Sequence, residues 1–371
     1  MSDRKPRLTY YSYDSQGNPW LSGGGSLRDW EVLRCLARHA DITLVVGRYS
    51  GFKSERREGI RIVGAGFGNR DALCRVAYTF AANLRMIFDG SEVIGISPSI
   101  YAPVLTWWLH RKRSYLVLHH YIGRQSFRKL GFFGVFPFLY EQFMIRMGRN
   151  YFVSNRSVRD RIRTANSEAR VEWTTNGFDP ALLNLDSAQS TPPFILFVGR
   201  FDVYMKGLDL LIPAYLEVAT SRDVDLVLAG RASEKDVLEI ERLIPKIMHG
   251  RIRVELNISA ARKAKLLSSC LFFCSPSRFE GFGIAALEAN AAGKAVLATD
   301  TDGFRDSLAL GETALSVPAE DAHALRDAML RLLEEPELRE RMGRKGRERA
   351  RAFSWEGIAE KEWEWIQGIM G

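Results

Sequence analysis

Two glutamates, Glu280 and Glu288, lie on either side of a loop that contains two glycines. The apolar run 271–275 before them predicts a buried strand, and the residues from Ile284 onward favour a helix that ends at Gly293. The predicted order is strand, glycine loop and helix. Free N–H groups and the positive end of the helix dipole make the start of such a helix a site for an anion, most often phosphate.

A second phosphate site is predicted earlier in the chain. The apolar run 194–199 predicts a strand that ends at Gly199, where Arg200 follows, and Lys206 stands just before a predicted helix. Two cations at a helix N-terminus suit a phosphate. Carboxylates beside such a site suit sugar hydroxyls, from which they accept hydrogen bonds. The residues therefore indicate a ligand that carries both phosphate and hydroxyl groups.

Both segments resemble the retaining glycosyltransferases of family 4, the group 1 glycosyltransferases. Residues 275–296 are similar to the E-x7-E signature of that family. Residues 199–207 are similar to its G-R-x-x-x-x-K-G element, although Arg200 and Lys206 are one position further apart than usual. The chain also departs from the family at Asn257, which stands where glycine is common.

The resemblance implies a role for each matching residue. Arg200 and Lys206 would neutralise the diphosphate of the donor, Glu280 would meet its sugar, and Glu288 would hold its ribose. Further donor-binding residues are expected in the two glycine loops: Gly199, Gly281, Phe282, Gly283 and Ile284.

The first half of the chain adds two weaker matches. The glycine loop 23–25 follows a strand predicted over 7–13 and resembles the family loop that approaches the donor diphosphate or the acceptor, which assigns Gly23 and Gly24 to the donor. The strand within 114–123 ends in two histidines. His119 matches the family histidine that approaches the donor sugar, whereas His120 stands where aspartate is common. A histidine that only makes local hydrogen bonds at a strand end is the alternative for His119.

The whole chain alternates strands and helices. Its 371 residues, 46% hydrophobic and 26% charged, predict two globular domains. The expected fold is α/β: the GT-B fold, with two Rossmann-like domains whose parallel sheets face a central cleft and a C-terminal helix that crosses back to the first domain. We expect an acceptor-side domain over 1–187 together with about 354–371, and a nucleotide-sugar domain over 188–353.

Four local predictions can be checked against the structure. A helix is expected over 101–113, and an irregular loop over 60–69, where three glycines resemble an incomplete dinucleotide fingerprint. A Ser-capped helix is expected within 151–162. A strand followed by a loop is expected over 294–308, where Asp300 and Asp302 resemble a metal-binding D-x-D motif that this family does not use.

Charge is unevenly distributed. Residues 1–187 carry 27 Lys and Arg against 16 Asp and Glu, and the remainder carries 25 against 28. A polyanionic partner is therefore expected for the first half: membrane lipid, nucleic acid or a phosphorylated acceptor. Residues 123–150 interleave cations and aromatics, which is typical either of a membrane-interface element or of a helix with a buried aromatic face.

Several classes of protein are disfavoured. The four cysteines have no framework spacing, and Cys270 and Cys274 are expected to be buried. We find neither a signal peptide nor a spanning helix by composition, which favours a cytoplasmic protein, with peripheral attachment to the inner membrane face as a further expectation. We expect no metal and no cofactor, since the nucleotide-diphosphate sugar is a co-substrate.

The predicted function is retaining transfer of a sugar from a nucleotide-diphosphate sugar to a hydroxyl of a saccharide or lipid-linked acceptor, in the synthesis of cell-envelope polysaccharide or glycolipid. Two alternatives remain. One is a GT-B nucleotide-sugar epimerase, and the other is a non-catalytic nucleic-acid binder that uses the basic first half. No clustered nucleic-acid-reading motif supports the latter, so nucleic acid is not an expected partner.

Overall fold

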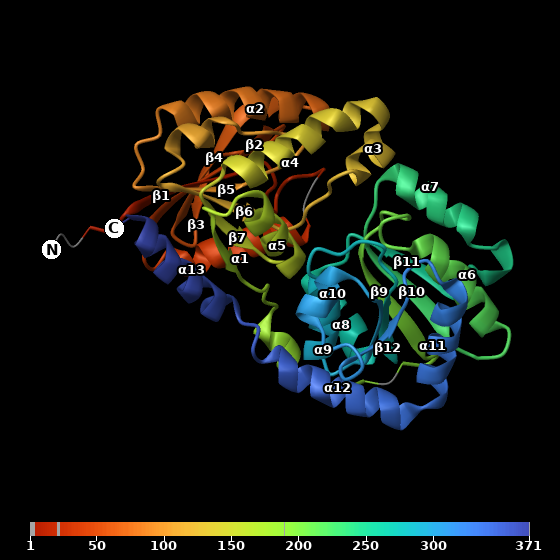
Figure 1. The fold of residues 1–371 in the computed structure, drawn as a ribbon. Coiled ribbons are helices and arrows are strands. Elements are labelled where there is room, and N and C mark those ends of the chain that lie inside the picture. The colour runs from red at the N-terminus through yellow and green to blue at the C-terminus, as the bar shows by residue number, and fades with distance from the viewer. Residues whose placement is uncertain (1–3, 21–22, 189, 371) are drawn as a thin grey trace. The chain divides into compact units, whose positions relative to one another are not determined.

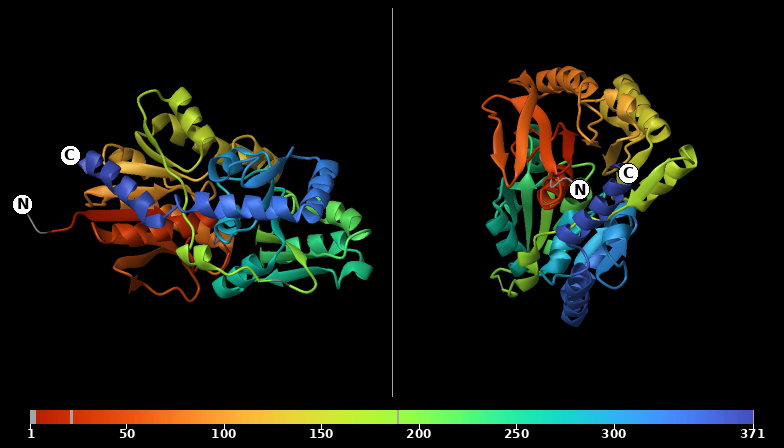
Figure 2. Two further views of the ribbon diagram at one scale, coloured as in Figure 1. Left: turned by 90° about the horizontal axis from the view of Figure 1, so that it is seen from below. Right: turned by 90° about the vertical axis from the view of Figure 1, so that its left-hand side faces the viewer.

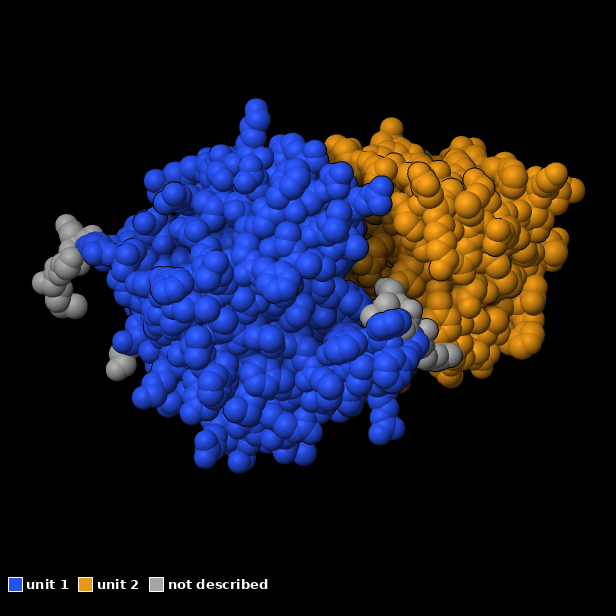
Figure 3. All heavy atoms as spheres, turned by 90° about the horizontal axis from the view of Figure 1, so that it is seen from above, with its two compact units in different colours: residues 1–176, 355–371 blue, residues 177–354 orange. Residues whose placement is uncertain are grey.

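The computed structural model describes residues 4–20, 23–188 and 190–370, without the side chains of 128–130 (Figure 1). The chain divides into two compact units, residues 1–176 with 355–371 (unit 1) and residues 177–354 (unit 2) (Figure 3). The sequence placed the first boundary at 187. The units divide earlier because Phe178 and Leu182 pack into the core of unit 2.

Unit 1 is built on a sheet with the strand order β3-β4-β2-β1-β5-β6-β7-β8 in its described part. All neighbouring strands are parallel except β3 and β4. Most residues of the inner strands are buried, as expected for a parallel sheet that is covered on both faces. The strands are β1 Arg7–Ser12, β2 Asp41–Tyr49, β3 Glu55–Arg57, β4 Ile60–Gly68, β5 Val93–Ser97, β6 Ser114–Leu118, β7 Asn150–Val153 and β8 Arg170–Trp173.

Helices cover both faces of this sheet (Figure 2). On one face, α2, η1, α4 and α5 contribute Tyr78, Trp107, Tyr140 and Ile162 to a single core cluster. On the other face, α1 and α13 lie together, and the buried Arg28 of α1 forms an ion pair with Glu362 of α13. The helices are α1 Gly24–Leu36, α2 Asp71–Ile87, η1 Thr106–His110, α3 Gln125–Leu130, η2 Gly131–Gly134, α4 Val135–Met147, α5 Arg156–Ala165 and α13 Trp355–Met370.

The return of α13 to unit 1 confirms the predicted crossing of the C-terminal helix. Trp365 of α13 packs against Phe152, with ring centroids 4.5 Å apart, and lies edge-on to Tyr115. Both partners come from neighbouring central strands of the sheet. The last helix is therefore an integral layer of the first unit.

Unit 2 has a fully parallel sheet in its described part, with the order β11-β10-β9-β12-β13-β14. Its strands are β9 Phe194–Arg200, β10 Asp225–Arg231, β11 Ile252–Leu256, β12 Phe272–Ser275, β13 Val296–Thr299 and β14 Ala314–Val317. Its helices are η3 Pro180–Asn184, α6 Leu208–Ala219, α7 Glu234–Leu243, η4 Lys246–Met248, α8 Ala260–Ser269, α9 Ile284–Ala291, α10 Asp302–Ser307, α11 Ala322–Glu334 and α12 Pro336–Ala350. This architecture confirms the predicted α/β class.

Two local predictions were wrong for identifiable reasons. Only Thr106–His110 is helical within 101–113, because the Asn83 side chain accepts hydrogen bonds from the N–H groups of Leu105 and Thr106 and so fixes a loop before them. Residues 60–68 form strand β4 rather than an irregular loop. Its glycines allow helix α2 to pack close to the strand, since a Cβ on Gly66 would lie 2.4 Å from the backbone of Ala77.

Two further predictions need a smaller correction. The cap of α5 is Asn155 rather than a serine, because its side chain accepts from the N–H groups of Ser157 and Val158. After β13 the chain enters the short helix α10 instead of a loop.

Candidate active site

The strand order of unit 2 creates a ligand site at the carboxyl ends of β9 and β12. The chain runs outward from β9 to β10 and β11, then returns to place β12 on the other side of β9. The loops after β9 and β12 therefore start next to each other. They touch at Gly207, whose left-handed φ of 67° brings it so close to Pro276 that a Cβ would lie 2.1 Å from the proline carbonyl. Open α/β sheets bind their ligands at such a reversal of strand order.

Lys206 and Glu280 meet at this point. Nζ of Lys206 donates to Oε2 of Glu280 over 2.7 Å, and both side chains are largely buried. The hydroxyl of Ser277 donates to the same oxygen over 3.4 Å. Within the described chain, Oε1 of Glu280 takes no hydrogen bond. The carboxylate is thus held through one oxygen, and the other remains available to a ligand.

Glu288 has a similar arrangement one turn into α9. Its carboxylate is buried, and Oε1 accepts a hydrogen bond from Nζ of Lys263 on α8. No described residue donates to its Oε2. Lys263 was not predicted as a site residue, because nothing in the local sequence links it to a glutamate 25 positions later.

Arg200 differs from Lys206. It is the last residue of β9, and its exposed guanidinium has no partner among the described side chains. Beside it, Gly199 lies close to Gly230 on the neighbouring strand β10, since a Cβ on Gly230 would lie 1.7 Å from the Gly199 carbonyl oxygen. The two predicted cations are therefore an arginine without a described side-chain partner at the end of β9 and a lysine held by an ion pair in the loop that follows.

The loop that leads into α9 is built as expected, with one exception. Gly283 is the N-cap of α9 with a φ of 86°, a conformation that favours glycine, and Ile284 begins the helix. The preceding Gly281 has no side chain to obstruct the loop. The ring of Phe282, in contrast, is buried in the core of unit 2 against Phe353. Phe282 therefore anchors the loop through its side chain.

In unit 1, His119 directly follows β6 and joins a polar cluster. Its Nε2 lies 3.1 Å from the hydroxyl of Ser97 and 3.3 Å from Oδ1 of Asp29 on α1. Oδ1 of Asp29 also accepts from the Tyr10 hydroxyl over 2.8 Å. Gly25 makes room for the ring, since a Cβ there would lie 3.0 Å from it. The other ring nitrogen, Nδ1, is buried and has no partner in the described chain.

The neighbours of Asp29 shift the pKa of its carboxyl group. Burial tends to raise the pKa of the Asp29 carboxyl, but His119 and Arg28 beside it outweigh burial and hold the pKa below its ordinary value. Asp29 is therefore ionised. Neither Asp29 nor Ser97 was predicted, although Asp29 lies on the helix that follows the glycine loop.

The loop after His119 is held in place by a buried glutamate on α4. Glu141 of α4 is buried and accepts hydrogen bonds from the N–H groups of Ile122 and Gly123 over 2.9 and 2.7 Å. Burial raises the pKa of this carboxyl, against the opposing effect of those two donors.

Two other predicted features of unit 1 can be located. His120 is exposed. The glycine loop is shorter than predicted, because Gly23 is the N-cap of α1 and Gly24 its first residue.

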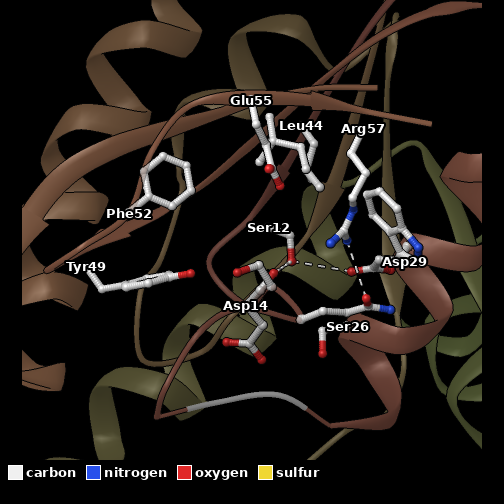
Figure 4. A pocket seen from close by; sticks show the side chains of 14 residues that line it. Ser12, Asp14, Ser26, Asp29, Leu44, Tyr49, Phe52, Glu55 and Arg57 are labelled. Atoms are coloured by element: carbon white, nitrogen blue, oxygen red, sulfur yellow. Dashed lines mark hydrogen bonds between the residues drawn. The ribbon is translucent and has the colours of Figure 1, made fainter. Parts of the chain in front are cut away.

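A small cavity of about 80 Å³ opens beside Asp29 (Figure 4). Carboxylates and hydroxyls point into it from β1, α1 and the segment around β3, and the rings of Tyr49 and Phe52 form one wall. Ser12 donates to the carbonyl of Asp14 and lies 3.4 Å from Oδ2 of Asp29. Polar groups beside aromatic rings suit a hydroxyl-rich ligand.

Asp300 and Asp302 bind an arginine. Nε and Nη2 of Arg305 donate to the two oxygens of Asp300 over 2.7 and 3.0 Å, and Asp302 lies 3.4 Å from Nη1. Within the described residues, no group of three or more His, Cys, Asp or Glu is placed to hold a metal ion.

Comparisons with known proteins show what the chain is similar to. Residues 186–349 match the model of the family described as glycosyl transferases group 1. The chain is 36% identical over 191 residues to a phosphatidyl-myo-inositol mannosyltransferase of Mycobacterium leprae, an alignment that covers 48% of this chain and 50% of that protein. The chain thus spans about half the length of the curated relatives it matches.

Solved structures extend the likeness to the whole chain. Sucrose-phosphate synthase from Thermosynechococcus elongatus aligns with a TM-score of 0.82 at 21% identity, over 98% of this chain and 99% of that one. HepE from Anabaena, solved in complex with UDP-glucose, aligns with a TM-score of 0.76 at 15% identity, over 98% and 100%. The chain therefore has the GT-B fold of the glycosyltransferases, and its residues 186–349 match group 1 of them.

Proposed function

We propose that the protein transfers a sugar from a nucleotide-diphosphate sugar to an acceptor hydroxyl with retention of anomeric configuration. The observation that carries this proposal is the meeting of Lys206 and Glu280 at the reversal of strand order, next to the N-terminus of α9. A cation and a carboxylate held together there suit a ligand that carries phosphate and hydroxyl groups side by side.

Departure of a nucleoside diphosphate places growing negative charge on the leaving phosphate. An ammonium group has three N–H donors, and Glu280 takes one from Lys206, which leaves two for a phosphate. Arg200 adds a planar guanidinium. It has no partner among the described side chains that a phosphate would have to displace. Fixed donors aimed at developing charge lower a barrier strongly, because they need no reorganisation during the reaction.

The two carboxylates hold the rest of the donor. Oε1 of Glu280 accepts from the sugar hydroxyls, and Oε2 of Glu288 accepts from the ribose hydroxyls. The lysines that hold the opposite oxygens fix the orientation of both carboxylates. For His119 we keep the role that the resemblance implies, contact with the donor sugar, with Asp29 and Ser97 to orient its ring.

We assign the acceptor to unit 1, where the cavity beside Asp29 carries hydroxyl-binding groups. A saccharide or lipid-linked acceptor in cell-envelope polysaccharide or glycolipid synthesis fits this assignment, and the name of the mycobacterial relative supports a lipid-linked one. We also propose that no metal or cofactor takes part, since Lys206 and Arg200 meet the diphosphate charge. A cytoplasmic site of action is consistent with four free, buried cysteines.

A panel of nucleotide sugars tests the donor assignment. A donor at a hundred times its dissociation constant would stabilise the protein by about 2.7 kcal/mol, which raises the unfolding temperature measurably. We expect one base and sugar combination to stabilise the wild type but not Lys206→Ala. Stabilisation by no member of the panel would contradict the proposal. Consumption of the donor without an acceptor, with release of free sugar, would favour the epimerase instead.

A further inference from the structure

The outer face of α2 is apolar along its whole length. One side of this helix packs on the sheet through Cys74, Tyr78, Ala82 and Met86. The opposite side is exposed and carries six large apolar side chains, with Phe80 73% and Phe88 79% accessible. These six are Leu73, Val76, Phe80, Leu84 and Ile87 together with Phe88, the residue that directly follows the helix. A helix with apolar residues on both sides is normally buried on both sides. The exposed apolar side of α2 therefore indicates a surface that binds a partner.

The apolar face continues onto η1 and α4. Asn83 of α2 ties down the start of η1 through the N–H groups of Leu105 and Thr106, and Tyr140 of α4 bonds to the backbone of Val104. All three elements lie on the same side of the sheet (Figures 1 and 2). Their exposed apolar residues are Leu105, Trp108 and Leu109 on η1, and Phe132, Phe133, Phe136 and Leu139 on η2 and α4. We call these residues and the six of α2 the apolar face.

This surface is concentrated in one part of the chain. Of the 20 large apolar side chains that are exposed in the described residues, 15 lie between positions 67 and 139. Phe132, at 82% accessible, stands far out of the surface. The rest of α4 packs inward through Tyr140, Met144 and Ile145. Segment 123–150 therefore has both a buried face and exposed aromatic side chains.

The charge around the apolar face is predominantly positive. Residues 67–150 contain eleven Lys and Arg and four acids, which are Asp71, Asp89, Glu92 and the buried Glu141. Asp71 is paired with Arg75, and Glu92 with Arg7. Arg111 and Lys112 are exposed directly after η1, and Arg124 is exposed just before α3. The side chains of Arg128 and Lys129 lie outside those that the structure describes. An apolar surface flanked by more cations than acids is complementary to a bilayer that contains anionic lipid.

We propose that the apolar face docks unit 1 on a membrane surface that contains anionic phospholipid. The aromatic and aliphatic side chains enter the headgroup region, and the flanking cations contact lipid phosphates. No helix among the described residues has the length and apolar composition to cross a bilayer. Attachment is therefore peripheral, reversible and weaker in salt, because ions screen contacts between exposed charges. This inference does not depend on the proposed sugar transfer.

Vesicle co-sedimentation without any donor or acceptor tests the docking. The probes are vesicles of phosphatidylcholine alone and of phosphatidylcholine with phosphatidylglycerol, each at low and high salt. One variant replaces Val76, Phe80 and Leu84 together by glutamine, a good helix former. Its matched control replaces three exposed apolar residues of unit 2, Leu238, Ile247 and Leu256, by glutamine. A charge variant combines Arg111→Glu and Lys112→Glu. Circular dichroism and gel filtration establish that each variant folds and report its oligomeric state.

We expect wild type and control to bind the anionic vesicles at low salt. The partition coefficient of the α2 variant should fall about tenfold or more, because apolar contacts with the bilayer are lost. The charge variant should lose the preference for anionic lipid. Absence of wild-type binding, or equal binding by the folded α2 variant, would overturn the proposal. So would a wild-type dimer that the α2 variant abolishes in protein that does not bind vesicles, since a second copy would then be the partner. If the α2 variant does not fold, the charge variant alone decides the outcome.

Discussion

Replacement of Lys206 by alanine tests whether its ammonium group contributes to catalysis or only to stability. In Lys206→Ala the leaving diphosphate loses the two N–H donors that Glu280 does not use. By analogy with the loss of a preorganised donor to developing charge, we expect the barrier to rise by about 2–4 kcal/mol. This corresponds to a fall in turnover of about thirty- to a thousandfold at saturating donor.

The same change also affects stability. The ion pair is 2.7 Å long and partly buried, so its loss should lower the unfolding free energy of unit 2 by about 1–3 kcal/mol, between the values for exposed and buried pairs. The double variant Lys206→Ala with Glu280→Gln removes the unpaired carboxylate charge. It should recover part of this stability but none of the turnover.

The assay measures release of nucleoside diphosphate, and thermal unfolding is followed in parallel. Arg262→Ala is the matched control, since it breaks an ion pair with Glu255 elsewhere in unit 2. It should leave turnover near the wild-type value. Turnover of Lys206→Ala within about twofold of wild type, or recovery of turnover together with stability in the double variant, would refute the catalytic assignment.

Three further outcomes are expected. EDTA should leave turnover largely intact, and so should Asp300→Asn, because Asp300 binds an arginine; loss of activity restored by Mg²⁺ would show a metal requirement. Glu288→Gln should weaken donor binding about tenfold in calorimetry, with a smaller effect on turnover at saturation, because a ribose contact is the same in ground and transition states. The folded-state pKa of Asp29 is lowered, so its stabilisation is present above its ordinary pKa, about 3.9, and is lost as pH falls through the folded value. Wild-type unfolding free energy should therefore fall more steeply below about pH 4 than that of Asp29→Asn; equal slopes would contradict the assignment.

Local patterns were sufficient to predict the two strands that carry the candidate site in unit 2. The apolar run of β9 ends at Gly199 and that of β12 is followed by Pro276. Gly283 and Gly293, both in left-handed conformations, mark the two ends of helix α9. Asn257, which stands where the family often has glycine, has a φ of 53°. Asparagine tolerates this region better than most residues, so the substitution keeps the turn.

Long-range pairings could not be predicted from the sequence. The contact of Lys263 with Glu288 and that of Asp29 with His119 depend on how helices dock on different strands, which no local spacing encodes. The side chain of Asn83 shortened a predicted helix more than 20 residues away. For a helix such as α2, an apolar pattern on both sides cannot tell which side meets the sheet.

The most direct test of the proposed sugar transfer is the anomeric configuration of the product, followed by proton NMR during turnover of the donor that stabilises the protein. The proposal predicts that each nucleoside diphosphate released is matched by one new glycosidic bond to the acceptor, with the donor's configuration kept. A product of inverted configuration would contradict the retaining mechanism, and donor consumption without any glycosidic bond would contradict transfer itself.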